Sequence, residues 1–293
     1  MIKKRHINRI DPVCYVVVLP LAVLFFLFHT YPFLNGVFYS LTDWKGYGKW
    51  NFTGLRNYLQ IFKDPNVISS YLFTFKFAIS ATILVNIISL LLACSLNANI
   101  AFKNFLKAVY FLPYMLGTLI ISYVFRFIFA NLLPSWMNAL GFNKMAINIL
   151  GTSHAWWGIL FVTVWQSLAF NTLIYIAGLQ TIDKELYEAA ALDGAHGLKE
   201  FFSITFPMLA PFFTINMILC AKNFLMAFDQ IIGLTNGGPG TTTTTISVLI
   251  YKRGFQGGQF AYQSADAVML FVVVILISVV QLNVLEKRER KYE

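Results

Sequence analysis

Six long apolar runs limit what this chain can fold into more than any other feature. They lie near residues 13–41, 70–96, 105–130, 155–179, 208–232 and 266–285. About 20 apolar residues in an α-helix cross the roughly 30 Å hydrocarbon core of a bilayer. Only 12% of the 293 residues are charged, against about 25% in an ordinary soluble domain. The sequence therefore predicts an all-α integral membrane protein, with six transmembrane helices in a single transmembrane domain covering residues 1–293.

The distribution of Lys and Arg predicts the orientation of the chain, because cytoplasmic loops carry an excess of these residues. With a cytoplasmic N-terminus, twelve lie inside: Lys3, Lys4, Arg5, Arg9, Lys103, Lys107, Lys184, Lys199, Lys287, Arg288, Arg290 and Lys291. Seven lie outside: Lys45, Lys49, Arg56, Lys63, Lys144, Lys252 and Arg253. We therefore expect both termini in the cytoplasm and a cytoplasmic loop at 180–207. The bases gather at the ends of the runs, so the net charge of +9 does not indicate nucleic-acid binding.

Other sequence features argue against a signal peptide, a metal site and catalysis. The first run follows four basic residues but is longer than the core of a secretory signal and has no small-residue cleavage pattern. Cys14, Cys94 and Cys220 fall within apolar runs and lack metal-ligand spacing, so we expect neither disulfides nor a metal. The four histidines are scattered and no nucleophile motif accompanies them. The chain is predicted not to be an enzyme.

The loop at 180–207 interrupts the apolar pattern with a polar, helix-prone segment. Asp183 is expected to cap a helix from about 184 to 193, because its carboxylate can accept an unpaired N–H of the first turn. Gly194 then ends this helix. A second short helix is expected over 198–206, after which Pro207 and Pro211 open the fifth run. The prediction is a helix, a glycine joint and a second helix.

The same loop reverses the charge balance of the other cytoplasmic segments. It contains five acids, Asp183, Glu185, Glu188, Asp193 and Glu200, against two bases. Ala189, Ala190 and Ala191 leave the first helix without bulk, so another backbone can approach it closely. This surface suits docking into a groove of a basic partner. The alternative is a solvated helix at the membrane interface.

The stretch "EAAALDGAHGLKEFFSITFP" resembles the EAA loop of bacterial ABC-importer permeases. The matching positions are Glu188, Ala189, Ala190, Gly194, Ile204 and Pro207. Phe206 stands where that family usually has Leu. The resemblance implies that this loop, including Asp193, is the coupling helix that docks in a cleft of a cytoplasmic ATPase subunit.

Further blocks resemble the carbohydrate-uptake branch of the same family, represented by the first permease of maltose-type and glycerol-phosphate-type importers. They are "YPFLNGVFYSLTDW", "FTGLRNYLQIFKDP", "GLQTIDKELYEAAALDGA" and "FDQIIGLTNGGPGTTT", in that order. The resemblance implies the type I importer permease fold and a prokaryotic cytoplasmic membrane. It also implies a second, homologous permease subunit, cytoplasmic ATP-binding subunits, an extracellular or periplasmic solute-binding protein and a carbohydrate substrate, which we expect to be an oligosaccharide.

The sequence contains no nucleotide site of its own. There is no GxxxxGK(S/T) phosphate loop anywhere in the chain. ATP must then be hydrolysed by a partner, and no cofactor is expected on this chain, since ATP and Mg belong to that ATPase.

Polar residues within the fifth run are candidates for the substrate path: Asn216, Lys222, Asn223 and Asp229. Lys222 and Asp229 are seven residues apart, which places them on one face of a continuous helix. Ionisable groups inside a span are costly and are often functional. They either line a wet cavity, where Lys222 would suit an acidic sugar or a phosphate, or form a buried pair that joins two spans.

The fourth run offers further candidates: Trp165, Gln166, Ser167, Asn171 and Tyr175. Aromatic rings with a polar edge suit the C–H face and hydroxyl rim of a sugar. We expect Trp165, Asn171 and Tyr175 along the path.

The stretch "NGGPGTTTTT" at 236–245 falls in the last outside loop. Gly237, Gly238 and Pro239 permit a tight turn, and the following threonines favour extended chain. The loop is either a solvated turn or, as the resemblance implies, a segment near the mouth of the path and the docked binding protein.

The sequence leaves three alternative functions to be weighed. A permease of the same class for glycerol phosphate or another polar solute is poorly separated from a sugar permease. An ion-coupled secondary carrier would need both sites within one chain, typically with duplicated halves, and no clear internal repeat is visible. A membrane enzyme lacks a nucleophile and base.

Overall fold

The computed structural model describes residues 12–97, 102–143 and 146–289. Within these ranges the regular structure is helical, apart from one isolated bridge between Thr42 and Phe52. The helices are α1 (Pro12–Phe25), η1 (Phe26–Thr30), α2 (Tyr31–Tyr39), α3 (Arg56–Ile61), α4 (Pro65–Asn97), α5 (Lys103–Met115), α6 (Thr118–Phe127), η2 (Ile128–Leu132), α7 (Leu133–Ala139), η4 (Ile149–Gly151), α8 (Ala155–Leu179), α9 (Lys184–Leu192), α10 (Leu198–Glu200), η5 (Phe201–Thr205), α11 (Phe206–Met208), α12 (Ala210–Leu225), α13 (Asp229–Leu234), α14 (Ile246–Tyr251), η6 (Lys252–Gln256) and α15 (Phe260–Glu289).

Helices long and apolar enough to cross a membrane account for most of the chain. In the described ranges there are five: Val16–Tyr39, Pro65–Asn97, Thr118–Ala139, Ala155–Leu179 and Phe260–Lys287. A sixth is formed if Leu198–Met208 and Ala210–Leu225, which meet at an angle of 69°, are counted as one broken span. The predicted all-helical membrane class is therefore confirmed, with five candidate spans in the described ranges, or six if the bent pair is counted.

Two of the apolar runs expected to be single helices are interrupted. The run at 105–130 breaks at Leu116 and Gly117, whose backbones are extended. The run at 208–232 bends at Leu209 and breaks again after Leu225. Pro207 and Pro211 each stand in the first turn of a helix, where a missing N–H is tolerated, and so start new segments. Non-helical backbone at membrane depth is tolerated only in protein or beside a wet cavity.

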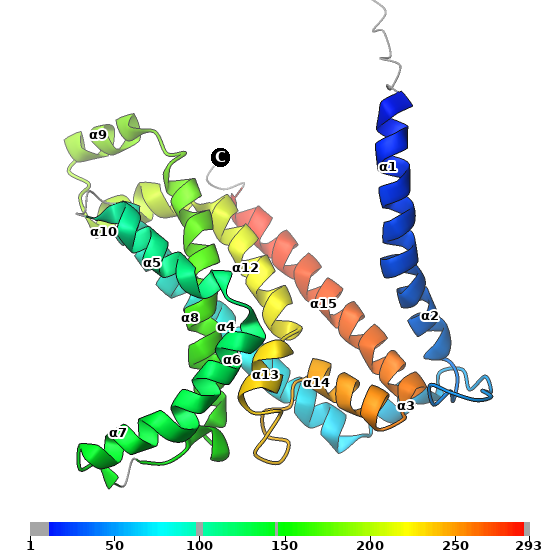
Figure 1. Cartoon of the computed structure of the whole chain (residues 1–293). Coiled ribbons are helices and arrows are strands. Elements are labelled where there is room, and N and C mark those ends of the chain that lie inside the picture. Colours follow the sequence, from blue (N-terminus) through cyan, green and yellow to red (C-terminus); the bar gives the residue numbers. More distant parts are fainter. Residues whose placement is uncertain (1–11, 98–101, 144–145, 290–293) are drawn as a thin grey trace, which may run out of the picture.

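The centre of the molecule is built on α8. This helix packs along α4, and α12 crosses α4 beside it (Figure 1). Phe77, Val85, Ile159 and Phe224 belong to the main apolar cluster that joins the three helices. The smaller helix α13 packs against α6 on the other side of α12. The helices α4, α6, α8, α12 and α13 therefore pack together at the centre of the molecule.

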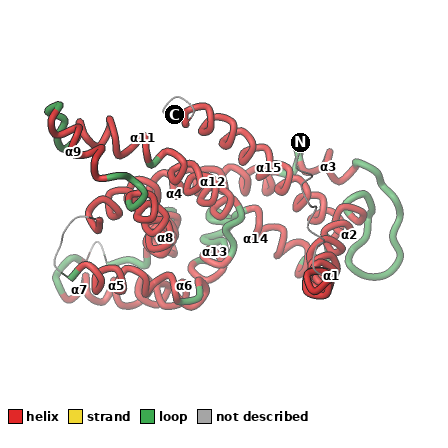
Figure 2. The backbone as a smooth tube through the Cα atoms, turned by 90° about the horizontal axis from the view of Figure 1, so that it is seen from above, coloured by secondary structure: helices red, strands yellow, loops and turns green. Residues whose placement is uncertain are grey.

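The N-terminal helices stand apart from this centre. Both views place α1 and α2 at the opposite edge of the molecule from α5, α6 and α7 (Figures 1 and 2). Contact with the rest runs mainly from α2 to α15, where the rings of Phe33 and Phe271 lie 4.8 Å apart. The side chains described in α1, from Val16 onward, are exposed.

The two ends of the helical bundle carry different predicted features. The segment α9–α10 lies at one end, and the loop between α13 and α14 lies at the opposite end (Figure 1). The start of α1 and the end of α15 lie toward the end that carries α9 (Figure 1). This arrangement agrees with the predicted topology, in which both termini and the 180–207 loop share one side; the orientation itself stays a prediction.

Candidate substrate cavity and coupling segment

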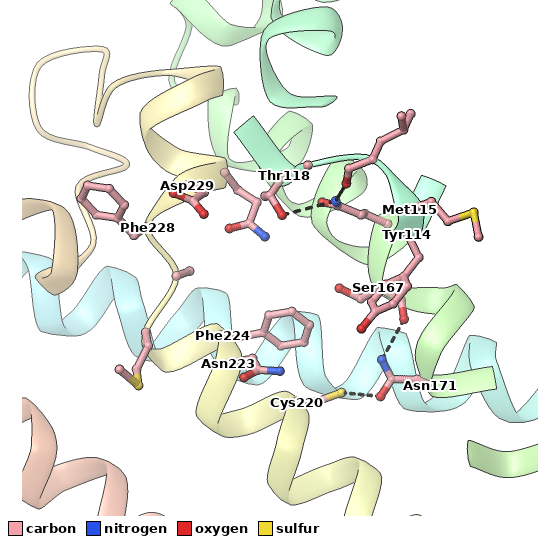
Figure 3. A pocket seen from close by; sticks show the side chains of 16 residues that line it. Tyr114, Met115, Thr118, Ser167, Asn171, Cys220, Asn223, Phe224, Phe228 and Asp229 are labelled. Atoms are coloured by element: carbon pink, nitrogen blue, oxygen red, sulfur yellow. Dashed lines mark hydrogen bonds between the residues drawn. The ribbon is translucent and has the colours of Figure 1, made fainter. Parts of the chain in front are cut away.

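A cavity of about 580 Å³ opens where the two broken runs meet α8. Its walls come from the end of α5 and start of α6, from α8, from α12 and from the link into α13 (Figure 3). The lining residues are Tyr114, Met115, Leu116, Gly117, Thr118, Gln166, Ser167, Asn171, Cys220, Asn223, Phe224, Met226, Ala227, Phe228, Asp229 and Gln230. The breaks in the helices thus supply two of the four walls.

Gln166 stabilises one of these breaks. Its Nε2 donates to the carbonyl of Leu116 and to Oγ1 of Thr118, each at 3.3 Å. The Leu116 carbonyl is freed where α5 ends, so α8 supplies a partner that the helix no longer offers. The cavity wall at 114–118 was not predicted, because the run at 105–130 reads as one apolar helix.

The chemistry of the lining is polar, aromatic and almost uncharged. Four amides, three hydroxyls and two phenyl rings face or border the space: Gln166, Asn171, Asn223 and Gln230; Tyr114, Thr118 and Ser167; Phe224 and Phe228. Asp229 is the one carboxylate, and no Lys, Arg or His lines the cavity in the described part of the chain. Such a surface suits a neutral ligand with many hydroxyl groups.

The structure brings together three of the predicted path residues. Asn171, Asn223 and Asp229 line the same cavity (Figure 3). Trp165, Tyr175, Asn216 and Lys222 do not. The expectation that Lys222 and Asp229 share a helix face is wrong, because α12 ends at Leu225 and Asp229 begins α13. Lys222 is exposed on α12, outside the cavity.

Tyr175 and Asn216 belong to a buried polar network beside the cavity. Both are 0% exposed. The Tyr175 hydroxyl donates to Oδ1 of Asn86 at 2.7 Å, and Nδ2 of Asn216 donates to the Asn171 carbonyl at 3.2 Å. Cys220 donates its thiol hydrogen to Oδ1 of Asn171 at 3.1 Å. These contacts join α4, α8 and α12, as polar residues do between membrane helices.

Trp165 lies in a separate, apolar groove. Its ring centroid is 5.1 Å from that of Phe125. The groove is lined by Leu84, Ile88, Trp157, Leu160, Phe161, Val164, Trp165 and Leu168. Because α8 has both a polar and an apolar contact surface, position in the run alone did not show which one Trp165 occupies.

The predicted coupling segment has the expected helix, glycine joint and second helix. The first helix is α9, and Gly194 follows it with φ +70°, a conformation that glycine adopts readily. The second runs through α10, η5 and α11 as far as Met208, two residues beyond the expected end. The Asp183 side chain makes no capping bond; its carbonyl accepts the Leu186 N–H at 3.2 Å instead.

The surface of this segment exposes both acidic and large apolar side chains. Glu188, Ala189 and Asp193 are exposed, while Ala190 is buried. Ile204 packs into the apolar cluster at this end of the bundle, and Pro207 lies in the first turn of α11. Large apolar side chains nearby are also exposed: Leu192 at 90%, Leu198 at 77% and Phe202 at 65%.

The loop at 236–245 forms the predicted tight turn, but Thr241–Thr243 lie in turns, and the extended backbone expected for the threonines is found at Thr245. Gly237 has φ +83°, and a Cβ there would lie 2.6 Å from Oγ1 of Thr244. The threonine hydroxyls donate back to the turn, from Thr244 to the Gly237 carbonyl at 3.1 Å and from Thr243 to the Gly238 carbonyl at 2.7 Å. Thr242 donates to the Pro239 carbonyl at 2.9 Å. These local bonds favour a folded loop over a strand.

Comparison with known proteins gives consistent results. The family described as "Binding-protein-dependent transport system inner membrane component" matches residues 85–291. The probable starch degradation products transport system permease protein AmyD of Thermoanaerobacterium thermosulfurigenes is 34% identical over 258 residues, which cover 88% of each chain. The multiple sugar-binding transport system permease protein MsmF of Streptococcus mutans is 35% identical, with 94% of each chain covered. The sn-glycerol-3-phosphate transport system permease protein UgpA of Escherichia coli O157:H7 is 29% identical, with 99% of each covered.

Solved structures show the same fold. A chain of a bacterial ABC transporter involved in the import of the acidic polysaccharide alginate superimposes with a TM-score of 0.81. The match covers 94% of this chain and 96% of that one, at 20% sequence identity. The predicted fold class is therefore confirmed at the level of the whole chain.

Proposed function

Because the chain belongs to the family of binding-protein-dependent transport system inner membrane components, we propose that it forms half of the translocation path of an importer for a neutral oligosaccharide. The chain is a permease subunit of an ABC importer and a multi-pass protein of the bacterial inner membrane. It is a non-catalytic component that works with a binding protein and a separate ATPase, so the ATP is not bound by this subunit.

The observation that carries the substrate proposal is the lining of the cavity. Amides and hydroxyls can exchange hydrogen bonds with sugar hydroxyls, and the rings of Phe224, Phe228 and Tyr114 can contact the C–H face of a sugar. Glycerol phosphate or an acidic sugar would need a cationic partner. Among the described residues, the lining contains Asp229 and no base, and Lys222, the basic residue predicted for the path, lies outside. The named transport systems of AmyD and MsmF also concern starch products and sugars.

A second permease subunit is part of the same proposal. The helices at Val16–Tyr39 are apolar, and none of their most apolar stretch is buried within this chain. In a bilayer such a surface contacts lipid or another membrane helix. A related subunit packed beside this one would supply the other wall of the path.

The coupling role of α9 follows from its surface. Acidic Glu188 and Asp193 and apolar Leu192, Leu198 and Phe202 are all exposed in the same segment, which is a combination suited to a cleft with basic and apolar residues. We propose that the ATPase binds α9 and that its ATP-driven movement is transmitted to the permease through this helix. The helices then alternate between inward-open and outward-open arrangements of the cavity. The loop at Gly237, Gly238 and Pro239 is proposed to lie near the outer mouth.

The substrate proposal is tested by two neighbouring residues of α12. In the complete importer reconstituted into proteoliposomes, Asn223→Leu should reduce uptake of the cognate oligosaccharide about tenfold, because a cavity amide is lost. Lys222→Leu is the matched control, since Lys222 is exposed but outside the cavity. Uptake should stay within about twofold. Equal losses in both variants, or uptake of glycerol phosphate in place of sugars, would overturn the proposal.

The coupling proposal is tested at α9 and its joint. Gly194→Pro imposes φ near −65° where the backbone has +70°, and Glu188→Lys reverses an exposed charge. Each should abolish uptake while the subunit still inserts into the membrane. Affinity purification from the native source should recover a P-loop ATPase and a second permease with the wild type. Unchanged uptake in either variant would rule out this coupling site.

A further inference from the structure

In the part of the chain that the structure describes, one side of the coupling helix α9 packs against the rest of the subunit. Tyr187 is half-buried and Ala190 is buried, whereas every other side chain of α9 is exposed. Residues three apart in a helix lie on the same side. Ala190 ends in a methyl group, so Tyr187 is the one long side chain by which α9 reaches into the bundle.

Tyr187 reaches the segment that leads into the cavity helix. Its ring belongs to the apolar cluster that contains Ile204 and Leu209. Its hydroxyl lies 3.2 Å from Oγ1 of Thr205, with either group able to donate. Thr205 is only 6% exposed and is the last residue of η5. The contact therefore joins two parts of the coupling segment, eighteen residues apart, within a packed environment.

The backbone between these two residues passes through two glycines, and local backbone bonds, such as that from the Ala195 N–H to the Ala190 carbonyl at 2.9 Å, close the turn. Gly194 and Gly197 both have positive φ, +70° and +61°, and a Cβ at either would meet nothing within 4 Å. Glycine gives the chain unusual conformational freedom. A movement of α9 would be absorbed at this joint unless a side chain holds the two sides together.

Thr205 is connected to the cavity through a short, helical path. The chain continues from η5 through α11 and turns by 69° into α12, and Leu209 at the turn is 0% exposed. Cys220 and Asn223 of α12 then line the cavity. We infer that the Tyr187–Thr205 hydrogen bond is the positioning link that makes α12 follow α9. This inference rests on the proposed coupling role of α9.

The test measures movement of the cavity wall without any sugar. In the complete importer, Cys14 and Cys94 are replaced by serine, and Cys220 is kept because it donates to Asn171. Met226→Cys serves as a reporter in the cavity wall, and the same protein lacking the reporter corrects for any labelling of Cys220. The rate of alkylation of the reporter by N-ethylmaleimide is measured with and without ATP and vanadate, and ATPase activity is measured on the same samples. The background with Tyr187 intact should show a clear ATP-dependent change in rate.

Tyr187→Phe keeps the ring and removes only the hydroxyl, and Thr205→Val keeps the shape of the threonine. Each should reduce the ATP-dependent change about two- to tenfold, the factor that one hydrogen bond contributes, while ATPase activity remains. The double variant should be no worse than either single, because both remove the same bond. Tyr123→Phe, exposed on α6, is the control and should behave as the background does.

Several outcomes would overturn the inference: a full response in Tyr187→Phe, cumulative losses in the double variant, or no ATP response in the background. Loss of the copurified ATPase together with the response would show a merely structural role. Because no carbohydrate is used, these results are independent of the substrate proposal, which is tested by uptake.

Discussion

The N-terminal arm, Val16–Tyr39, and the central helix α8 are both apolar and long enough to cross a bilayer, but their surroundings are opposite. None of the most apolar stretch of the arm is buried, whereas 67% of that of α8 is. The arm is also the more apolar of the two. In a membrane chain, apolarity reports which solvent surrounds a helix and says little about burial within the subunit, because lipid is as apolar as a protein core.

Small and polar residues distinguish the buried helix α8 from the exposed arm better than apolarity does. A Cβ on Gly178 of α8 would lie 2.6 Å from Cδ2 of Phe212 and 2.7 Å from Cδ2 of Leu209. A Cβ on Gly36 of the arm would meet nothing within 4 Å. Asn171 and Tyr175 of α8 hold hydrogen bonds to α12 and α4. Close approach and interhelical hydrogen bonds are what hold membrane helices together.

The sharpest test of this comparison is a matched pair of glycine substitutions. Gly178→Val should destabilise the subunit by about 3 kcal/mol, because the side chain has no room beside Phe212 and Leu209. Gly36→Val should change stability by less than about 0.5 kcal/mol. Thermal unfolding of the isolated subunit in detergent measures both. Equal destabilisation would show that the arm is packed as tightly as α8.

A smaller effect is expected from removing one hydroxyl in each region. Tyr175→Phe leaves Oδ1 of Asn86 without its 2.7 Å partner and should cost about 1 kcal/mol. Tyr31→Phe, on the exposed arm, is the control and should have no measurable effect in the same unfolding assay. If Tyr175→Phe were also neutral, the buried network would not contribute to holding α4 against α8.

The smallest effect concerns an ion pair between Asp64 and Arg253 and depends on pH. Arg253 donates to Oδ2 of Asp64, just before α4, at 2.5 Å. Burial raises the pKa of Asp64, but hydrogen bonds from Arg253 and from the Asn66 N–H lower it more, so it lies below the ordinary 3.8. A lowered folded pKa stabilises the protein above about pH 4, and this stabilisation is lost as the pH falls further.

Asp64→Asn should therefore lower stability by about 1 kcal/mol near pH 7, and the difference from wild type should vanish near pH 3. Asp43, close to the arm, also has a lowered pKa through its hydrogen bonds with Asn51, but it is fully exposed. Asp43→Asn is thus the control, with no expected change in unfolding temperature at either pH. A difference for Asp64→Asn that persists at pH 3 would exclude the ionised pair as its cause.

Local features of the candidate sites could be predicted from the sequence. The helix at 184–192 and the glycine joint at Gly194 depend on residues adjacent in the chain, and both are present. The Asp183 cap was predicted from the same kind of pattern and was wrong, and extended backbone is absent at Thr241–Thr243, because carbonyl groups nearby offered competing partners. Asn223 and Lys222 show the limit most clearly. They are adjacent polar residues in one apolar run, yet of the two only Asn223 lines the cavity.

By itself the sequence determined the class of the protein: an all-helical membrane subunit with six apolar runs, one polar, helix-prone loop between them and no phosphate-loop motif of its own. Only the tertiary structure decided where the cavity lies and which residues face it. Its walls come from 114–118, 166–171 and 220–230, and two of these walls exist because helices break within apolar runs. Hydropathy indicates whether a segment lies in lipid or in water. It does not predict which side of a helix faces the cavity or which helices pack against it. At the break in the run at 105–130, a distant side chain, Gln166, supplies a hydrogen bond to the Leu116 carbonyl that the helix no longer offers.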